Sequence, residues 1–293
     1  MHIDEKYRQM APAYNEAKEK LIYLFTDLIK SKKIQTHAIT GRVKSVESYC
    51  EKAKKYDDPE SKIMDYIGIR IITYVQSDVN DICKIVQKEF IVDENNSINK
   101  SDKLGIDKIG YNSIHYIARM KKKRTALLEY SFMENICFEI QVRTILQHTW
   151  AEIEHDRNYK FSGVLPADIK RKFNLLSAVL EVVDNEFNNI AEEIDKYKII
   201  VKEDINNSDL EIEINSISIK EYANDKLMGL IDLSHSDLRW KERGEGVVKE
   251  LLDYGLKTIS ELDLLFKKFP IEYLKDKRNE KSTILGIIRD VLM

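Results

Sequence analysis

The hydrophobic pattern changes its period most clearly within residues 138–160. Over 138–143 apolar and polar residues alternate strictly, which predicts a strand with one apolar face and one polar face. From 145 onward the apolar residues step by threes and fours, as on the buried side of a helix. The polar strand face carries Glu139, Gln141 and Arg143, and a polar helix face carries His148 and Glu152. A functional site is therefore expected where this strand meets this helix.

Further elements follow from the same two periods. Helical spacing covers about 7–28, 45–55 and 78–90, the last with Asp78 as its N-cap, and a long helix begins at Pro166. The near-continuous apolar run over 63–75 predicts a strand buried on both faces, and 114–120 predicts another strand. Residues 91–113 are polar and predict irregular structure. Together these elements predict an α/β (α+β) fold in which helices flank a mixed central sheet.

The long helix and the region after it set the predicted domain organisation. Apolar residues step by four and three from Ile169 to Ile194, which is a heptad seam that could pack on the sheet or pair with another subunit. A homo-oligomer is therefore left open. Residues 204–208 resemble a polar linker, 210–219 a strand or extended arm, and helices follow. We expect two domains, 1–203 and a mainly helical accessory domain over 204–293 that serves regulation or contacts.

Composition limits the classes of partner. The chain has 293 residues, of which 43% are hydrophobic and 33% charged, as in ordinary soluble globular proteins. A net charge of −3 gives no global attraction to nucleic acid or acidic membranes, so such binding would need a local patch. The three cysteines are an odd number and match no CxxC pattern, and we find neither a membrane-spanning apolar run nor a signal peptide. These features predict a cytoplasmic protein that does not bind membranes.

Charged residues that suit a nucleotide precede the strand–helix unit. Arg42 and Lys44 stand two apart in an extended segment, so both can reach one polyphosphate, although a solvated basic strand has the same pattern. Asp65 opens the 63–75 strand and Arg70 lies within it. A buried arginine needs an anion or a stacked base, and an Asp65–Arg70 ion pair without catalytic meaning is the alternative.

Aromatic and basic residues between 100 and 124 offer further contacts. Tyr111 follows Gly110 and can present a flat face to a purine base. The run 121–124 is Lys-Lys-Lys-Arg, which is either a solvated strand end or a local patch for RNA phosphates. His148, Glu152 and His155 share helical spacing but match metal-binding motifs only weakly, so we predict no transition-metal site there.

Four ordered blocks carry a resemblance to a known family. They are Gly41-Arg-Val-Lys-Ser45 with Ser48 and Lys52, Asp65-Tyr-Ile-Gly-Ile-Arg70, Gly110-Tyr-Asn-Ser-Ile-His115, and Glu139-Ile-Gln-Val-Arg-Thr144 followed by Trp150-Ala-Glu-Ile-Glu-His155 and Tyr159-Lys160. In this order they resemble the core signature of the RelA/SpoT-type alarmone synthetases. The resemblance covers about residues 20–200 and is closest to the small synthetases of that family.

The resemblance implies a nucleotidyltransferase-like synthetase domain and roles for single residues. Asp65 and Glu139 are expected to be the catalytic carboxylates that hold Mg²⁺. The residues expected to bind ATP are Arg42, Lys44, Ser48 and Arg70. Those expected to contact the acceptor nucleotide are Lys108, Tyr111, His115, Gln141, His148 and Glu154. Many relatives have a basic residue or glutamine where this chain has Asn112, which leaves the acceptor open.

The implied activity is that of a GTP pyrophosphokinase of the stringent response. Pyrophosphate would pass from ATP to the ribose 3′-hydroxyl of GDP or GTP, giving AMP and (p)ppGpp. One alternative is a toxic small synthetase that modifies the 3′ end of tRNA or makes adenine alarmones, which the basic run allows. Another is an inactive nucleotide-binding regulator, which would not need both Asp65 and Glu139. Residues 204–293 could bind an antitoxin or another regulatory partner.

Overall fold

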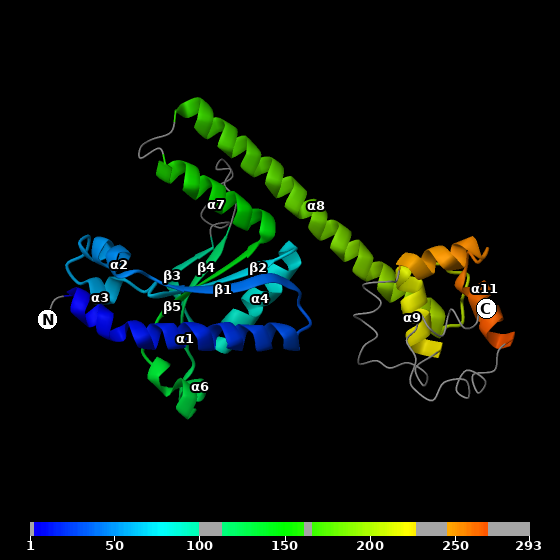
Figure 1. Ribbon diagram of the computed structural model, residues 1–293, viewed down its shortest axis with the longest axis horizontal. Coiled ribbons are helices and arrows are strands. Elements are labelled where there is room, and N and C mark those ends of the chain that lie inside the picture. Colours follow the sequence, from blue (N-terminus) through cyan, green and yellow to red (C-terminus); the bar gives the residue numbers. More distant parts are fainter. Residues whose placement is uncertain (1–2, 100–112, 161–165, 227–244, 269–293) are drawn as a thin grey trace. The chain divides into compact units, whose positions relative to one another are not determined.

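The computed structural model describes residues 3–99, 113–160, 166–226 and 245–268 (Figure 1). The chain forms two compact units, Met1–Asn189 and Ile190–Met293, each with its own hydrophobic core. This division falls earlier than the predicted boundary at 203. The reason is that the last turns of the long helix already contribute Val201 and Ile205 to the second core.

The first unit is built on a mixed sheet of five strands in the order β1-β2-β5-β4-β3 (Figure 1). β2 and β5 pair in parallel, whereas the pairs β1–β2, β3–β4 and β4–β5 are antiparallel. The strands are β1 (Thr36–Val43), β2 (Ile67–Thr73), β3 (Phe90–Asn99), β4 (Ile114–Met120) and β5 (Phe138–Thr144). The predicted mixed sheet with flanking helices is confirmed.

Helices connect and cover these strands. Those that begin in the first unit are α1 (Ile3–Ser31), α2 (Val46–Ala53), α3 (Pro59–Lys62), α4 (Gln76–Glu89), α6 (Lys122–Thr125), the 3₁₀ helix η1 (Leu128–Met133), α7 (Ile145–Lys160) and α8 (Ala167–Asn206). α1 and α4 lie on one side of the sheet and α7 on the other, as the two sides of Figure 1 show.

The core of the first unit lies between the sheet and α1 with α4. Phe25 of α1 stacks on Phe90 with ring centroids 5.0 Å apart, and Phe138 of β5 meets Phe90 edge-on at 5.7 Å. Burial of one such side chain stabilises the fold by about 1.5–3 kcal/mol. Because a shift of one residue would turn every buried side chain of a strand outward, this core fixes the register of the strands. The polar residues of β5 must then face α7.

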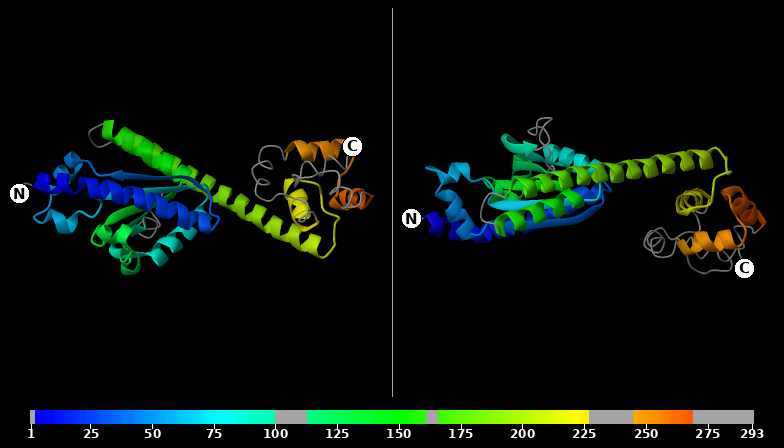
Figure 2. Two further views of the ribbon diagram at one scale, coloured as in Figure 1. Left: turned by 60° about the horizontal axis from the view of Figure 1, so that its bottom comes forward. Right: turned by 90° about the horizontal axis from the view of Figure 1, so that it is seen from above.

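α1 runs along β1 (Figure 2). Two side chains of α1, those of Lys18 and Ile22, lie against Gly41 of β1. A Cβ atom at Gly41 would lie 2.7 Å from Cγ of Lys18 and 3.0 Å from Cδ1 of Ile22. Distances this short are not tolerated between carbon atoms in a packed interior. The space between α1 and β1 therefore requires glycine at this position.

The first half of α8 is held to the first unit by polar contacts and by an edge-on contact of Phe173 with Trp150 of α7, with ring centroids 5.4 Å apart. Thr144 Oγ1 at the end of β5 donates to the buried Asp184 at 2.8 Å, and the backbone N–H of Ser77 donates to Asn188 Oδ1 at 2.7 Å. By contrast, the seam residues Ile169, Leu176, Val183 and Phe187 are exposed. This part of the predicted seam therefore does not pack on the sheet.

The described part of the second unit is helical. The end of α8 packs with α9 (Ser216–Lys226), the helical residues 245–253 and α11 (Ile259–Lys268) around a cluster of apolar side chains. The Tyr222 hydroxyl donates to Asp263 Oδ1 within this core at 2.9 Å. Across the ranges that the structure describes, none of the helices has the length and apolar character needed to cross a bilayer.

Two element predictions in the first unit are wrong. Most of the segment from 91 to 99, expected to be irregular because it is polar, belongs to β3 and pairs with β4 at the edge of the sheet. The register is irregular between Asp93 and Ile98, and there Asp93 accepts the backbone N–H groups of Asn95 and Asn96. Asp78 is not the N-cap of its helix: α4 begins at Gln76 after Val75, and Asp78 lies in its first turn.

One prediction beyond residue 203 is wrong, and another is confirmed only in part. The expected linker over 204–208 is helical up to Asn206, since Ile205 is buried in the second core. The expected strand or extended arm over 210–219 ends at Asn215, whose Oδ1 accepts the N–H groups of Ile217 and Ser218 and so caps α9. The extended part that remains forms one isolated bridge, from Glu213 to Thr258.

Candidate active site

The polar face of the sheet brings together side chains from four strands. The β1–β2 register places Arg42 opposite Gly68, and the parallel β2–β5 register places Glu139 beside Gly68. His115 of β4 lies opposite Gln141 of β5. Because partners in adjacent strands point to the same side of a sheet, these side chains project from one face. The motif residues predicted from separate blocks thus share one surface.

Gly68 is a buried position between Arg42 and Glu139 on this face. A Cβ atom at Gly68 would lie 3.7 Å from Nε of Arg42 and 3.9 Å from Oε2 of Glu139. Glycine therefore places no side chain between the guanidinium and the carboxylate. The guanidinium can pair with a phosphate and the carboxylate with a metal ion.

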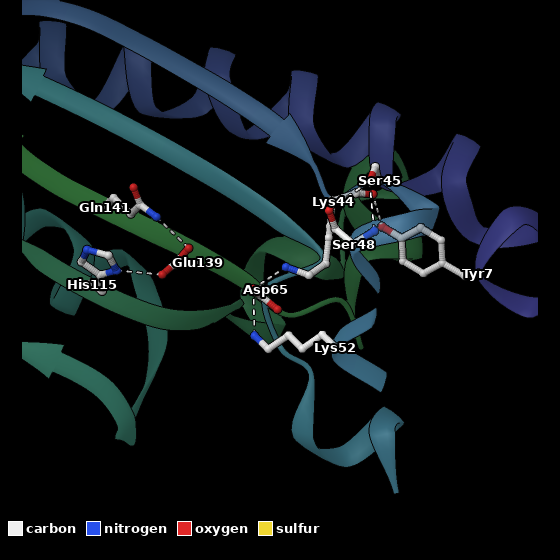
Figure 3. A network of polar contacts seen from close by, with 9 residues as sticks. All are labelled: Tyr7, Lys44, Ser45, Ser48, Lys52, Asp65, His115, Glu139 and Gln141. Carbon is white, nitrogen blue, oxygen red and sulfur yellow. Dashed lines mark hydrogen bonds and ion pairs between the residues drawn. The ribbon is translucent and has the colours of Figure 1, made fainter. Parts of the chain in front are cut away.

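Asp65 lies just before β2 and is bound by two lysines (Figure 3). Its Oδ2 accepts hydrogen bonds from Nζ of Lys44 at 2.8 Å and from Nζ of Lys52 at 3.0 Å. Burial alone would raise the pKa of Asp65, but the hydrogen bonds and charges of the two lysines outweigh burial and lower it. Its Oδ1 is buried and accepts no hydrogen bond among the described residues, so it is available to a cation.

The lysines of this group are placed by the cap of α2. Ser45 is the N-cap, and its Oγ accepts the backbone N–H of Ser48 at 3.1 Å. Ser48 and Lys52 are four residues apart and so lie on the same side of α2. Lys44 directly precedes the cap. The cap therefore fixes the chain reversal that directs Lys44 and Lys52 to the same carboxylate.

Glu139 of β5 forms the second carboxylate group (Figure 3). Its Oε1 is 2.8 Å from Nδ1 of His115, and its Oε2 accepts a hydrogen bond from Nε2 of Gln141 at 2.8 Å. Ser113 Oγ lies 2.8 Å from the other ring nitrogen of His115. Burial would raise the pKa of Glu139, but the hydrogen bond and charge of His115 and the bond from Gln141 outweigh burial and lower it. Glu139 is therefore ionised at neutral pH.

A capping box sets the start of α7 directly after β5. Gln147 N–H donates to Thr144 Oγ1 at 3.2 Å, and Thr144 N–H donates to Oε1 of Gln147 at 3.0 Å. This reciprocal pair is the Thr-x-x-Gln form of the capping box. Gln147 Nε2 also donates to Gln76 at the start of α4 at 3.0 Å. The two contacts fix the direction in which α7 leaves the sheet.

α7 carries Glu152 to two arginines of the sheet. Glu152 Oε1 lies 3.0 Å from Nη1 of Arg70 and 3.7 Å from Nη2 of Arg143, and His148 Nδ1 is 3.7 Å from the same oxygen. Burial, followed by the charges of Arg70 and Arg42, lowers the pKa of Arg143 to about 10 against the opposing effect of Glu152. Burial and the charge of Arg143 lower the pKa of His148. His148 is therefore neutral at pH 7.

This cluster has an excess of positive charge. Within the described residues, the buried Nε atoms of Arg70 and Arg143 have no hydrogen-bond partner. A single carboxylate, Glu152, faces both guanidinium groups. An anionic ligand would supply the missing acceptors and reduce the repulsion between the arginines. The alternative of an Asp65–Arg70 ion pair is wrong, because both residues have other partners.

One predicted acceptor residue, Glu154, points away from this group. Glu154 is exposed on α7, two residues beyond Glu152, which corresponds to about 200° around the helix axis. Lys108 and Tyr111 lie outside the described residues, as does Asn112. The roles of Glu154, Lys108 and Tyr111 stay predictions.

Three charged residues of the site had no predicted role: Lys52, Arg143 and Glu152. The four-residue spacing of Ser48 and Lys52 on one helix could have indicated Lys52. The alternation of β5 already placed Arg143 on the polar face. The contact of Glu152 with Arg70 depends on how α7 crosses the sheet, and no residue pattern gives that angle.

The donor atoms of Asp65 and Glu139 suit a hard divalent cation. Both carboxylates are ionised, and Oδ1 of Asp65 is available to a cation. The charge of Asp65 raises the pKa of Glu139, so the two carboxylates lie close enough to interact electrostatically. In the described ranges, no three His, Cys, Asp or Glu residues lie together so that they could hold a metal ion. Two carboxylates that leave positions for phosphate oxygens are the usual protein ligands of Mg²⁺.

Known proteins are similar to this chain in sequence and in fold. Residues 41–164 match the model of the region found in RelA / SpoT proteins. GTP pyrophosphokinase YjbM of Bacillus subtilis (strain 168) is 29% identical over 208 residues, which cover 65% of this chain and 91% of that protein. The crystal structure of the small alarmone synthetase 1 from Bacillus subtilis matches with a TM-score of 0.54 at 27% identity, covering 66% of this chain and 99% of the other.

A structure of the same synthetase bound to its product pppGpp matches with a TM-score of 0.52, at 27% identity over 65% of this chain and 98% of the other. The matched region and the relatives named GTP pyrophosphokinase identify the first unit as a pyrophosphokinase domain. Residues 41–164 carry the region found in RelA / SpoT proteins, and the chain is similar to the small alarmone synthetases. The family predicted from the four motif blocks is confirmed.

Proposed function

We propose that this protein transfers the pyrophosphoryl group of ATP to the ribose 3′-hydroxyl of GDP or GTP, with release of AMP. The observation that carries the proposal is the placement of Asp65 and Glu139, with their cationic neighbours, on one face of the sheet. The RelA / SpoT region at residues 41–164 and similarity to proteins named GTP pyrophosphokinase support the same reaction.

The donor side of the site is basic. Lys44 and Lys52 would release Asp65 and bind the phosphates of ATP, while Arg42 and Arg70 would contact its phosphates and base. Ser48, in the first turn of α2, would donate its hydroxyl to a phosphate oxygen. The two lysines would exchange the carboxylate of Asp65 for phosphate oxygens, so their positive charges stay paired with an anion.

Asp65 and Glu139 would hold Mg²⁺ with the phosphate oxygens of ATP. When bound, the ion neutralises phosphate charge in the transition state. The lysines now on Asp65 occupy one carboxylate oxygen, and the buried Oδ1 is available to the metal. The described residues therefore fit a site that is completed by the metal–nucleotide complex.

In the reaction, the 3′-oxygen of the acceptor bonds to the β-phosphorus of ATP. The bond between that phosphorus and the oxygen bridging to the α-phosphate breaks, and AMP leaves with the oxygen. Because the pKa of Glu139 is lowered, Glu139 is a weak base. Its main contribution would be to orient the hydroxyl, whose proton leaves late in the loose transition state of phosphoryl transfer.

On the acceptor side, His115 and Gln141 flank Glu139 and would contact the attacking nucleotide. His148, neutral at pH 7, can accept or donate a hydrogen bond to a base without adding charge. Glu154, Lys108 and Tyr111 are proposed for the same nucleotide from the motif match. Guanine nucleotides are the proposed acceptors because the similar synthetase was crystallised with pppGpp.

The test is transfer of label from ATP labelled in its β-phosphate, with Mg²⁺, to GDP, GTP, ATP and deacylated tRNA in separate reactions. We expect label on GDP or GTP. Label on tRNA alone would identify a tRNA-modifying toxin instead, and ATP binding without transfer to any acceptor would indicate an inactive regulator. Two cations of the 121–124 run already have intramolecular partners, Arg124 on Glu89 and Lys121 on the carbonyl of Lys88, which weakens the case for an RNA patch.

A further inference from the structure

The backbone of Lys44 is held on both sides by residues from other parts of the chain. Its N–H donates to the carbonyl of Tyr66 at 2.9 Å. Its carbonyl accepts the hydroxyl of Tyr7, from α1, at 2.5 Å (Figure 3). The N–H belongs to the peptide before the Cα atom and the carbonyl to the peptide after it. Because each peptide is planar, the two hydrogen bonds restrict φ and ψ of Lys44 and so the direction of its Cα–Cβ bond.

Tyr7 is well placed to act as a fixed donor. Its side chain is buried, and its ring stacks on Tyr49 with centroids 4.3 Å apart and an angle of 17° between the planes. Its ring also contacts Tyr14 and Tyr66, with centroids 5.6 Å and 6.2 Å away, so aromatic neighbours hold it in place. Burial, with the nearby Tyr14 and the charge of Asp65, raises the pKa of Tyr7 to about 12. The phenol therefore stays a hydrogen-bond donor throughout the physiological pH range.

The contact between Tyr7 and Lys44 adjoins the proposed ATP-binding residues. Lys44 Nζ lies 2.8 Å from Asp65 Oδ2, and Lys44 stands between the end of β1 and the cap of α2. Without the Tyr7 hydroxyl, only the end of β1 and the cap of α2 would hold the carbonyl of Lys44, and ψ of Lys44 would vary over a wider range. The ammonium group at the end of four methylene groups would then sample positions away from the phosphates.

We propose that Tyr7 is a positioning residue of the donor site, which orients Lys44 toward Asp65 and the phosphates of ATP. The proposal rests on the proposed function in one respect, that Lys44 binds ATP. Tyr7 lies on α1, outside the 41–164 region that defines the family. The N-terminal helix is thereby part of the nucleotide-binding machinery and not only a cover for the sheet.

The test compares Tyr7→Phe with Tyr222→Phe. Tyr7→Phe keeps the stacked ring and removes only the hydroxyl. Tyr222→Phe removes a buried tyrosine hydroxyl of the second unit, which donates to Asp263 at 2.9 Å, so it controls for the loss of a buried hydrogen bond. The measurements are the Kd of a non-hydrolysable ATP analogue with Mg²⁺, the KM values of ATP and acceptor, and kcat.

We expect Tyr7→Phe to weaken binding of the ATP analogue and to raise the KM of ATP, each by about three- to tenfold. This is the change in affinity that corresponds to the net free energy of one hydrogen bond. The KM of the acceptor should stay unchanged. Tyr222→Phe should change none of these. A purely structural role of Tyr7 would instead lower the active fraction, and thus kcat, with both KM values unchanged.

A double-mutant cycle tests the route through Lys44. If Tyr7 acts by orienting the Lys44 ammonium, Tyr7→Phe should have no further effect on analogue binding in a Lys44→Met background. Equal losses in both backgrounds would overturn the proposal, as would analogue binding by Tyr7→Phe within about twofold of wild type. Because analogue binding needs no turnover, the cycle remains valid if the wild-type protein transfers nothing to any acceptor, a result that would defeat the proposed function alone.

Discussion

Replacement of Glu139 by glutamine tests the carboxylate on which the proposed reaction depends. The substitution keeps the shape of the side chain and removes its charge. Glu139 now accepts one hydrogen bond on each oxygen, from His115 and from Gln141, both at 2.8 Å. A glutamine has one accepting oxygen, so it can keep one of these bonds and must present its NH₂ group to the other partner.

The two consequences differ in size. Loss of one charge-assisted hydrogen bond at a largely buried group lowers the free energy of unfolding by about 1–3 kcal/mol. This corresponds to a fall in Tm of a few degrees for each kcal/mol in a domain of this size. Loss of the charge that holds the cation and orients the hydroxyl should lower kcat by at least about 100-fold, as for other groups that stabilise transition-state charge.

The assay combines label transfer to GDP with a thermal melt of the same sample. Glu129→Gln, at an exposed position of η1, is the matched control and should keep full activity. The reasoning is refuted if folded Glu139→Gln turns over within about threefold of wild type, since this would show that the charge at this position does not contribute to the transition state. A variant that has lost activity because it is unfolded would be recognised by its melt.

Three further predictions concern the space and charge of the site. Gly68→Leu should abolish label transfer and lower Tm, because Gly68 is buried and the larger side chain would displace Arg42 and Glu139, whereas Gly68→Ala meets only ordinary contacts and should be active. Gly41→Ala should lower the free energy of unfolding by about 1–3 kcal/mol in a urea titration, since its Cβ overlaps α1, and an unchanged midpoint would contradict the close packing described. The pKa of Asp65 is lowered from its ordinary 3.8, so its contacts with the two lysines stabilise the fold above pH 3.8. This stabilisation is lost as the pH falls through the lowered pKa. Urea unfolding between pH 2 and 7 should therefore show a weaker acid dependence for Asp65→Asn than for wild type.

The sequence predicted the parts of the site that depend on local periodicity. Strict alternation placed Glu139 and Gln141 on one strand face, and helical spacing placed His148 on the helix that follows. These predictions succeed because a strand with one buried face can turn only one set of side chains toward the core. The order of the motif blocks then identified the family before any tertiary contact was known.

Contacts between distant elements could not be predicted in the same way. The shared hold of Lys44 and Lys52 on Asp65 depends on the turn between β1 and α2, and the contact of Arg70 with Glu152 depends on the crossing of α7 over the sheet. Both are set by packing, for which a single sequence has no periodic signal. The prediction of an irregular segment in place of β3 failed for a related reason: pairing at a sheet edge tolerates polar residues that local propensity disfavours.

The parallel pairing of β2 with β5 has a consequence for the order of folding. The antiparallel pairs join strands that follow one another in the chain, whereas β2 and β5 are separated in sequence by both β3 and β4. Contacts with a larger sequence separation require closure of a longer loop and form more slowly. Since Glu139 reaches Gly68 only through this pair, the carboxylate groups would come together late in folding, after the hairpin-like pairs. A nascent or partly folded chain would then lack the assembled site and could not consume ATP before the sheet is complete.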